Sequence, residues 1–157
     1  MKKVIAVIAC EETSAAQKST AFNLLTTFEN VNINICGNLG LEELVFSTNN
    51  YITGFIPWLT FNPTVQAKCN RIFSYQTYKA EMRYAANDMV EDIHDKYRDL
   101  SQGAKKMLAR IYLCIAECDE VFVFPCYTKG GGSGMAIEIA KRLGKKLIVV
   151  NRDGEVI

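Results

Sequence analysis

One stretch near the C-terminal end constrains the fold more than any other part of the chain. An apolar run of strand length at 120–124 leads into a glycine-rich loop at 130–134, and the loop opens an apolar helix at 134–143. Backbone N–H groups at a helix start can hold a phosphate when glycine leaves them uncovered. The loop has more glycine than a turn needs, and each glycine costs ordering entropy. The residues we predict to bind an anion are Gly131, Gly132, Ser133 and Gly134.

Strand signals alternate with helix signals along the chain. The apolar, β-branched run at 3–9 is typical of a strand buried on both faces of a parallel sheet. Ser14 and Gln17 are spaced as a capping box for the helix that follows, and an alternating strand at 31–36 is expected nearer the sheet edge. This order predicts an α/β fold, a Rossmann-like (flavodoxin-like) three-layer sandwich with a mostly parallel sheet of about four to five strands.

The middle of the chain is harder to interpret. A short helix is predicted at 41–46, and the aromatic segment 51–61 is either an irregular strand or a loop that lines a pocket. A long helix is predicted at 78–100 from its helical apolar stripe. Ser101 caps the next helix, and a last strand is predicted at 146–150. The 157 residues are expected to form one domain, 1–157.

Charge and hydropathy exclude several classes of function. The net charge of +1 gives no electrostatic reason to expect a nucleic acid or membrane partner. No apolar run has the length of a membrane span, and the run after Met1 is too short for a secretion signal, so we expect a cytoplasmic protein.

The cysteines do not predict a metal site. Six cysteines occur without a Cys-x-x-Cys pair, and His94 is the single histidine, so zinc-ligand spacing is missing. We expect reduced, mostly buried thiols. Cys10 and Cys126 stand at two predicted strand ends and can meet in a crevice, but no flanking base or cation cluster would lower a thiol pKa there.

Glu138 is the acid closest to the glycine loop, four residues after Gly134. Its neighbours in sequence are apolar on nearly all sides, which predicts a buried carboxylate, and buried carboxylates are often functional. The alternative is that an acid near a helix start only complements the helix dipole.

The segment 119–150 resembles two enzyme families. In nucleoside 2-deoxyribosyltransferases and the related deoxynucleoside 5′-monophosphate N-hydrolases, an Asp precedes the strand and Gly-x-x-x-Glu lies on the helix. Here Asp119 and the pair Gly134 and Glu138 match that pattern. The resemblance implies that Glu138 is the nucleophile on the anomeric carbon, with Asp119 as a second catalytic residue.

The loop is also similar to the Pro-Gly-Gly-x-Gly-Thr-x-x-Glu signature of Lonely Guy phosphoribohydrolases, with Gly130 in place of Pro and Met135 in place of Thr. Both families are Rossmann-like and cleave an N-glycosidic bond with a glutamate on a helix. Gly132 stands roughly where the transferases carry an acid, which suits a phosphate better than a free sugar hydroxyl. The resemblance therefore implies a nucleoside 5′-monophosphate ligand.

We therefore expect an enzyme that hydrolyses or transfers at the N-glycosidic bond of a nucleoside 5′-monophosphate, without a cofactor. Ligand contacts are expected from Cys10, Glu11 and Tyr127 at strand ends, and the second acid is Asp119, Glu11 or Glu12. Related families often complete their sites across subunits, so a homo-oligomer is expected. The alternatives are a non-catalytic nucleotide-binding domain and a partner-binding protein that uses the aromatic segment around Trp58.

Overall fold

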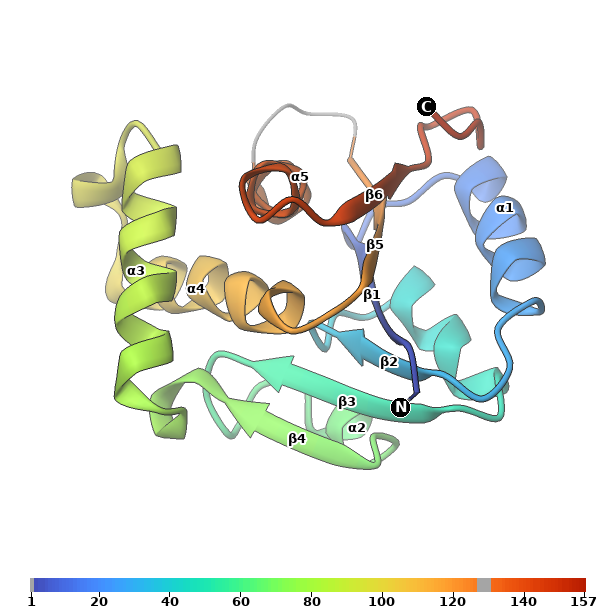
Figure 1. Ribbon diagram of the computed structural model, residues 1–157, viewed down its shortest axis with the longest axis horizontal. Coiled ribbons are helices and arrows are strands. Elements are labelled where there is room, and N and C mark those ends of the chain that lie inside the picture. The colour runs from blue at the N-terminus through green and yellow to red at the C-terminus, as the bar shows by residue number, and fades with distance from the viewer. Residues whose placement is uncertain (1, 127–130) are drawn as a thin grey trace.

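The protein is a three-layer α/β sandwich built on a parallel sheet (Figure 1). A computed structural model describes residues 2–126 and 131–157. Within these residues six strands pair in the order β4-β3-β2-β1-β5-β6, and every pair of neighbouring strands is parallel. The strands are β1 Val4–Ala9, β2 Asn32–Ile35, β3 Tyr51–Ile56, β4 Arg71–Ser74, β5 Glu120–Phe124 and β6 Lys146–Val149. The predicted fold class is confirmed.

β1 lies inside the sheet because both of its faces are apolar. Ala6 and Ile8 pack on one face of the sheet, and Ile5 and Val7 pack on the other. Each of these side chains is at most 2% exposed. Burying one valine or isoleucine side chain stabilises the fold by about 1.5–3 kcal/mol. The continuous apolar run therefore fixes β1 at the centre, as the sequence predicts.

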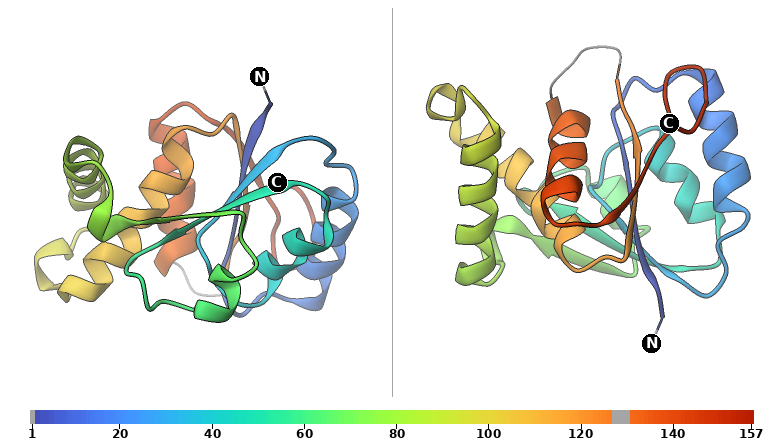
Figure 2. Two further views of the ribbon diagram at one scale, coloured as in Figure 1. Left: turned by 90° about the horizontal axis from the view of Figure 1, so that it is seen from below. Right: turned by 45° about the horizontal axis from the view of Figure 1, so that its top comes forward.

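Helices cover both faces of the sheet (Figure 2). One face carries α1, the 3₁₀ helix η1 and α2, and the other carries α3, α4 and α5. Their bounds are α1 Ala15–Leu25, η1 Leu41–Ser47, α2 Pro63–Gln66, α3 Ala80–Ile93, α4 Gln102–Ala116 and α5 Gly131–Arg142, with short 3₁₀ turns η2 Tyr75–Thr77 and η3 Tyr97–Asp99.

The predicted helix caps are confirmed. The Ser14 hydroxyl accepts the Gln17 backbone N–H, and the Gln17 side chain accepts the Ser14 backbone N–H, which completes the capping box. The Ser101 hydroxyl accepts the N–H of Ala104 at the start of α4.

The sheet differs from the prediction in two ways. It has six strands where four to five are predicted, because the segment at 51–61 supplies the regular strand β3, and β4 extends the sheet beyond it. The edge position predicted for β2 is wrong, since β2 lies between β1 and β3. Its polar Asn34 is buried and donates to the Cys114 carbonyl of α4, so the alternation came from a satisfied buried amide and not from solvent exposure.

The predicted long helix at 78–100 is shorter in the structure. α3 ends at Ile93, and His94 has an extended backbone. The Nδ1 atom of His94 accepts the Lys96 N–H at 3.2 Å, a local bond that replaces continued helical bonding. The apolar stripe continues across this break because Tyr97 in the next turn packs on the same core.

The C-terminal turn docks against α1. The Thr20 hydroxyl donates to the Gly154 carbonyl at 2.7 Å, and Gly154 has a φ of +80°. A Cβ atom at Gly154 would lie 2.7 Å from the Ala16 carbonyl oxygen. Only glycine fits both the backbone conformation and this close approach.

We expect opposite effects from alanine at two glycines. Gly154→Ala introduces strain and a clash, and is expected to lower the free energy of unfolding by about 1–3 kcal/mol. Gly134→Ala adds a methyl group to open space in α5 and is expected to raise it by about 0.5–1 kcal/mol. Urea denaturation of both variants measures the difference, and equal effects would contradict the docking of the C-terminal turn.

Candidate functional site

The chain changes direction across the sheet at β1, which lies between β2 and β5. Beyond the carboxyl ends of parallel strands, such a switch point is where ligands bind in α/β folds. A cavity of about 220 Å³ lies there, between the strand ends, α4 and the start of α5. We call it the carboxyl-edge crevice. Its polar lining residues are Cys10, Glu11, Asn38, Arg110 and Ser133, with Gly132 beside them.

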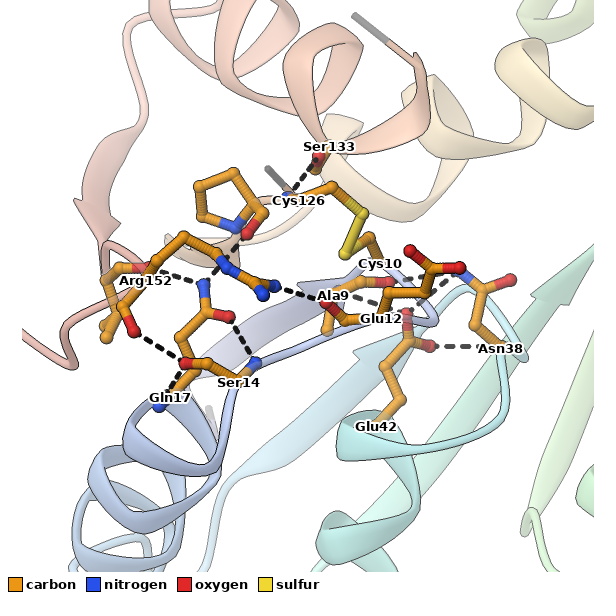
Figure 3. Close-up of a disulfide and its surroundings, with 12 residues drawn as sticks. Ala9, Cys10, Glu12, Ser14, Gln17, Asn38, Glu42, Cys126, Ser133 and Arg152 are labelled. Atoms are coloured by element: carbon orange, nitrogen blue, oxygen red, sulfur yellow. Dashed lines mark hydrogen bonds between the residues drawn. A yellow bond between two sulfur atoms is a disulfide. The ribbon is translucent and has the colours of Figure 1, made fainter. Parts of the chain in front are cut away.

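A buried carboxylate, Glu42 of η1, organises the floor beside the crevice (Figure 3). It accepts N–H bonds from the backbone of Ala9 at 3.2 Å, of Cys36 at 3.0 Å and of Asn38 at 3.3 Å. The Asn38 side chain donates to Glu42 and to the Ala9 carbonyl. One carboxylate thus ties the ends of β1 and β2 to η1.

Burial raises the pKa of the Glu42 carboxyl to about 7. The N–H donors and the positive charge of Arg110 oppose this rise, but desolvation is the larger effect. Glu42 therefore changes its charge near neutral pH, where an exposed glutamate is fully ionised.

Arg110 is the buried cation of the site. It comes from α4, is 2% exposed, and donates to the Cys36 carbonyl and, at 3.3 Å, to the Asn38 side-chain oxygen. Its guanidinium lies 5.0 Å from the centre of the Phe61 ring. Its Nε is buried and has no hydrogen-bond partner within the described residues. The guanidinium thus lines the crevice with one donor unused.

α5 begins at Gly131, three residues earlier than the sequence predicts. The glycines therefore form its first turn, and Gly131 has a φ of +70°. Gly132 and Ser133 line the crevice, whereas Gly131 and Gly134 border a second cavity beside the end of α3. The buried Ser133 hydroxyl accepts the Cys126 N–H at 3.4 Å, so it ties α5 to the end of β5.

The expected burial of Glu138 is wrong, because the residue is exposed. It is the eighth residue of α5 and lies about 10 Å along the axis from Gly131. The apolar neighbours Ala136, Ile139 and Ala140 form a single buried stripe, and Glu138 falls outside it. The structure therefore does not bring Glu138 into the crevice lining.

Asp119 lies at the amino ends of the strands, opposite the end at which the crevice lies. It precedes β5, is exposed, and accepts the Val4 N–H at 2.9 Å. The five residues of β5 span about 16 Å, so a strand length separates Asp119 from the crevice. The crevice lining does not include Asp119, and its contact in the structure is with the start of β1; its catalytic role stays a prediction.

The predicted residues at the strand ends fare differently. Cys10 and Glu11 line the crevice, and their contact with a ligand stays a prediction. Glu12 is exposed, and its carbonyl accepts an N–H from Arg152. Tyr127 lies outside the described residues.

Cys10 and Cys126 are joined in a disulfide. The expectation of reduced thiols is therefore wrong for this pair, because the ends of the parallel strands bring the two cysteines together.

The other side of the same sheet edge is closed. The buried Gln17 side chain donates to the carbonyls of Pro125 at 2.9 Å and Val150 at 3.1 Å. The Ser14 hydroxyl donates to the Arg152 carbonyl at 2.6 Å. These bonds fasten α1 to the ends of β5 and β6 (Figure 3), and the crevice lies on the other side, between the strand ends, α4 and α5.

Larger hollows offer less chemistry. One of about 620 Å³ lies between the end of α1 and η1, and Glu29 is the ionisable side chain in its described lining. The cavity beside α3, of about 420 Å³, is bordered by exposed or half-buried His94, Asp95 and Lys96.

Across residues 2–126 and 131–157, no group of three His, Cys, Asp or Glu side chains is placed to hold a metal ion. In the same residues, no helix has the length and apolarity to cross a bilayer.

Comparisons of the chain with protein-family models, with curated proteins and with solved structures found no match. The likeness to the two N-glycosidic enzyme families therefore stays a prediction from the loop motif.

Sequence reasoning missed Glu42, Asn38 and Arg110. A signal for two of them is present, since Glu42 lies inside the apolar stretch 41–46, and Arg110 follows Met107 by three positions on the buried face of α4. A charged residue at a core position of an amphipathic helix marks a buried charge that needs partners.

We expect the Glu42 carboxyl to make folding stability pH-dependent. Between pH 4.5 and 7 the folded chain holds a proton on Glu42 that the unfolded chain releases, so raising the pH through this window favours unfolding. From pH 4.5 to pH 7, the free energy of unfolding of the wild type should fall by about 3 kcal/mol more than that of Glu42→Gln, which has no carboxyl at this position. Denaturant titrations from pH 4.5 to 7.5 measure it.

The neighbouring Glu43→Gln is the matched control and should keep the wild-type slope, since Glu43 is only half-buried. A wild-type slope equal to that of Glu42→Gln would contradict the assignment.

Proposed function

We propose that the carboxyl-edge crevice binds a nucleoside 5′-monophosphate, with the phosphate between the first turn of α5 and the Arg110 guanidinium. The observation that carries this proposal is that Arg110, a buried residue in the crevice lining, has an Nε without a hydrogen-bond partner within the described residues. A buried donor of this kind costs free energy until it is paired.

Charge supports an anionic ligand. Arg110 is nearly fully buried, and the buried carboxylate that interacts with it electrostatically is Glu42, whose pKa burial raises to about 7. Near neutral pH the guanidinium is therefore only partly compensated. A phosphate in the crevice supplies the missing negative charge and can accept the Nε–H bond.

The start of α5 supplies the second half of the anion site. The first N–H groups of a helix have no partner inside the helix, and the helix dipole favours negative charge there. Gly132 keeps this end open, because a Cβ atom there would lie 3.3 Å from the Ile111 side chain on the crevice wall. α5 has 12 residues, long enough for its dipole to act on a bound phosphate.

The wall of α4 suits the rest of a nucleotide. Met107, Leu108 and Ile111 line the crevice on this side and offer an apolar surface for a sugar or a base. Polar groups at one end and apolar groups along one wall match a ligand with a charged phosphate and a flat, weakly polar base.

We expect Arg110→Lys to weaken binding of a deoxynucleoside 5′-monophosphate about tenfold, because lysine keeps the charge but has no donor at the Nε position. Arg142→Gln is the control: it removes a cation from the exposed end of α5, where Arg142 pairs with Asp92, and should leave the affinity unchanged. Isothermal titration calorimetry with the monophosphate and with sulfate measures both. Equal affinities of wild type and Arg110→Lys would contradict the proposal.

Cleavage of the N-glycosidic bond is the second candidate function. The observation that favours it is a carboxylate in the crevice lining, Glu11, at the end of β1. Glycosidic cleavage needs an acid beside the anomeric carbon, as nucleophile or proton donor. By position this acid is Glu11, whereas by resemblance to the N-glycosidic families it is Glu138.

We expect Glu11→Gln to lower release of free base from a deoxynucleoside 5′-monophosphate by about 10²-fold or more, and Glu138→Gln to leave it near wild type. Chromatography of the reaction mixture measures free base. The opposite pattern would assign the chemistry to Glu138 and contradict the position argument. No base release from monophosphates that bind would leave the protein a nucleotide-binding domain.

A further inference from the structure

The Cys10–Cys126 disulfide lies at the wall of the carboxyl-edge crevice (Figure 3). It joins two residues 116 positions apart in the chain, with their Cα atoms 5.6 Å apart. Both cysteines lie near the carboxyl ends of neighbouring strands, Cys10 directly after β1 and Cys126 two residues after β5. Both are half-buried, so small molecules in the crevice can approach the sulfurs.

The disulfide is not what holds these strand ends together. β1 and β5 pair along their whole length up to Ala9 and Phe124, and the Cys10 N–H donates to the Phe124 carbonyl at 3.3 Å. The Ser133 hydroxyl fixes the Cys126 N–H independently. Opening the sulfur–sulfur bond therefore leaves both thiols next to each other and ready to close again.

The four other cysteines are poor partners for exchange. Cys36, Cys114 and Cys118 are buried, and Cys69 is half-buried. Burial raises the pKa of the Cys69 and Cys118 thiols to about 11, and raises that of Cys114 as well. Thiolates form rarely at Cys69, Cys114 and Cys118, and Cys36 is buried away from solvent, so we expect thiol exchange at neutral pH at the Cys10–Cys126 pair.

The two sulfurs have different surroundings. Cys10 is part of the crevice lining, whereas Cys126 is not in that lining, so we infer that an entering thiol meets the Cys10 side of the disulfide first. Cys126 lies beside the first turn of α5, as its 3.4 Å bond to Ser133 shows. The positive end of a helix stabilises a thiolate, and a more stable thiolate is a better leaving group in exchange.

We propose that Cys10–Cys126 is a thiol–disulfide exchange site for a small thiol that enters through the carboxyl-edge crevice, with Cys10 as the attacked sulfur and Cys126 as the leaving group. The thiolate of the small molecule forms a bond to the Cys10 Sγ. The Cys10–Cys126 bond breaks, and its electron pair stays on the Cys126 Sγ.

A second small thiolate then attacks the sulfur of the small molecule bound to Cys10 and releases the Cys10 thiolate. The net reaction reduces the protein disulfide to two thiols and oxidises two small thiols to one disulfide. The protons of the small thiols end on Cys10 and Cys126. This inference does not depend on the proposed nucleotide site, and its test needs no nucleotide.

The first test uses the unmodified chain. The protein is equilibrated without oxygen in buffers that span ratios of reduced to oxidised glutathione, quenched with acid, and labelled with a maleimide after denaturation. We expect the number of labelled thiols to move reversibly from four to six as the buffer becomes more reducing. Six labels at every ratio, or four at every ratio, would overturn the proposal.

The second test fixes the direction of attack. In Cys126→Ser, Cys10 remains as the free cysteine of the pair, and in Cys10→Ser, Cys126 remains. We expect the glutathione mixed disulfide on Cys10 to reach about tenfold higher occupancy than that on Cys126. The reasons are that Cys10 faces the crevice and that α5 stabilises the free Cys126 thiolate. Cys69→Ser, which alters a half-buried cysteine outside the pair, should behave like the wild type. Equal occupancy in the two single variants would overturn the assignment of the attacked sulfur.

Discussion

A single buried carboxylate, Glu42, holds together the edge of the sheet on which the candidate site is built. The ends of β1 and β2 present backbone N–H groups of Ala9 and Cys36 that the strand ladders no longer pair, and Glu42 accepts both. Buried N–H groups without acceptors cost free energy comparable to a lost hydrogen bond. Glu42 satisfies them at the cost of its own desolvation, which is why its pKa rises toward neutrality.

At the carboxyl ends of the strands, the two faces of the sheet differ, and this difference decides on which face a ligand can bind. On the α1 side, Gln17 donates to carbonyls of Pro125 and Val150 and fills the space beyond β5 and β6. On the α4 side, Arg110 reaches Cys36 and Asn38 but leaves its Nε unpaired within the described residues. The polar groups on the α1 side are therefore paired within the chain, whereas the α4 side has one guanidinium donor without a partner within the described residues, where we propose that an anion binds.

The two proposed sites share one small volume. The first turn of α5 and Arg110 favour negative charge, which would stabilise both the proposed phosphate and a thiolate at Cys126. The proposed phosphate and the disulfide thus lie at the same helix end.

The sequence by itself determined the fold class, the central strand, the caps at Ser14 and Ser101, and a glycine-rich helix start beside Cys10 and Glu11. These follow from local patterns, since periodicity, capping and glycine content act over a few residues. Only the tertiary structure decided that Glu138 points to solvent, because the exposure of a helix residue depends on which side of the helix packs against the rest of the fold. The tertiary structure also decided that Glu42, Asn38 and Arg110 meet, and that Cys10 pairs with Cys126 across 116 residues, because parallel strands bring distant segments to one edge.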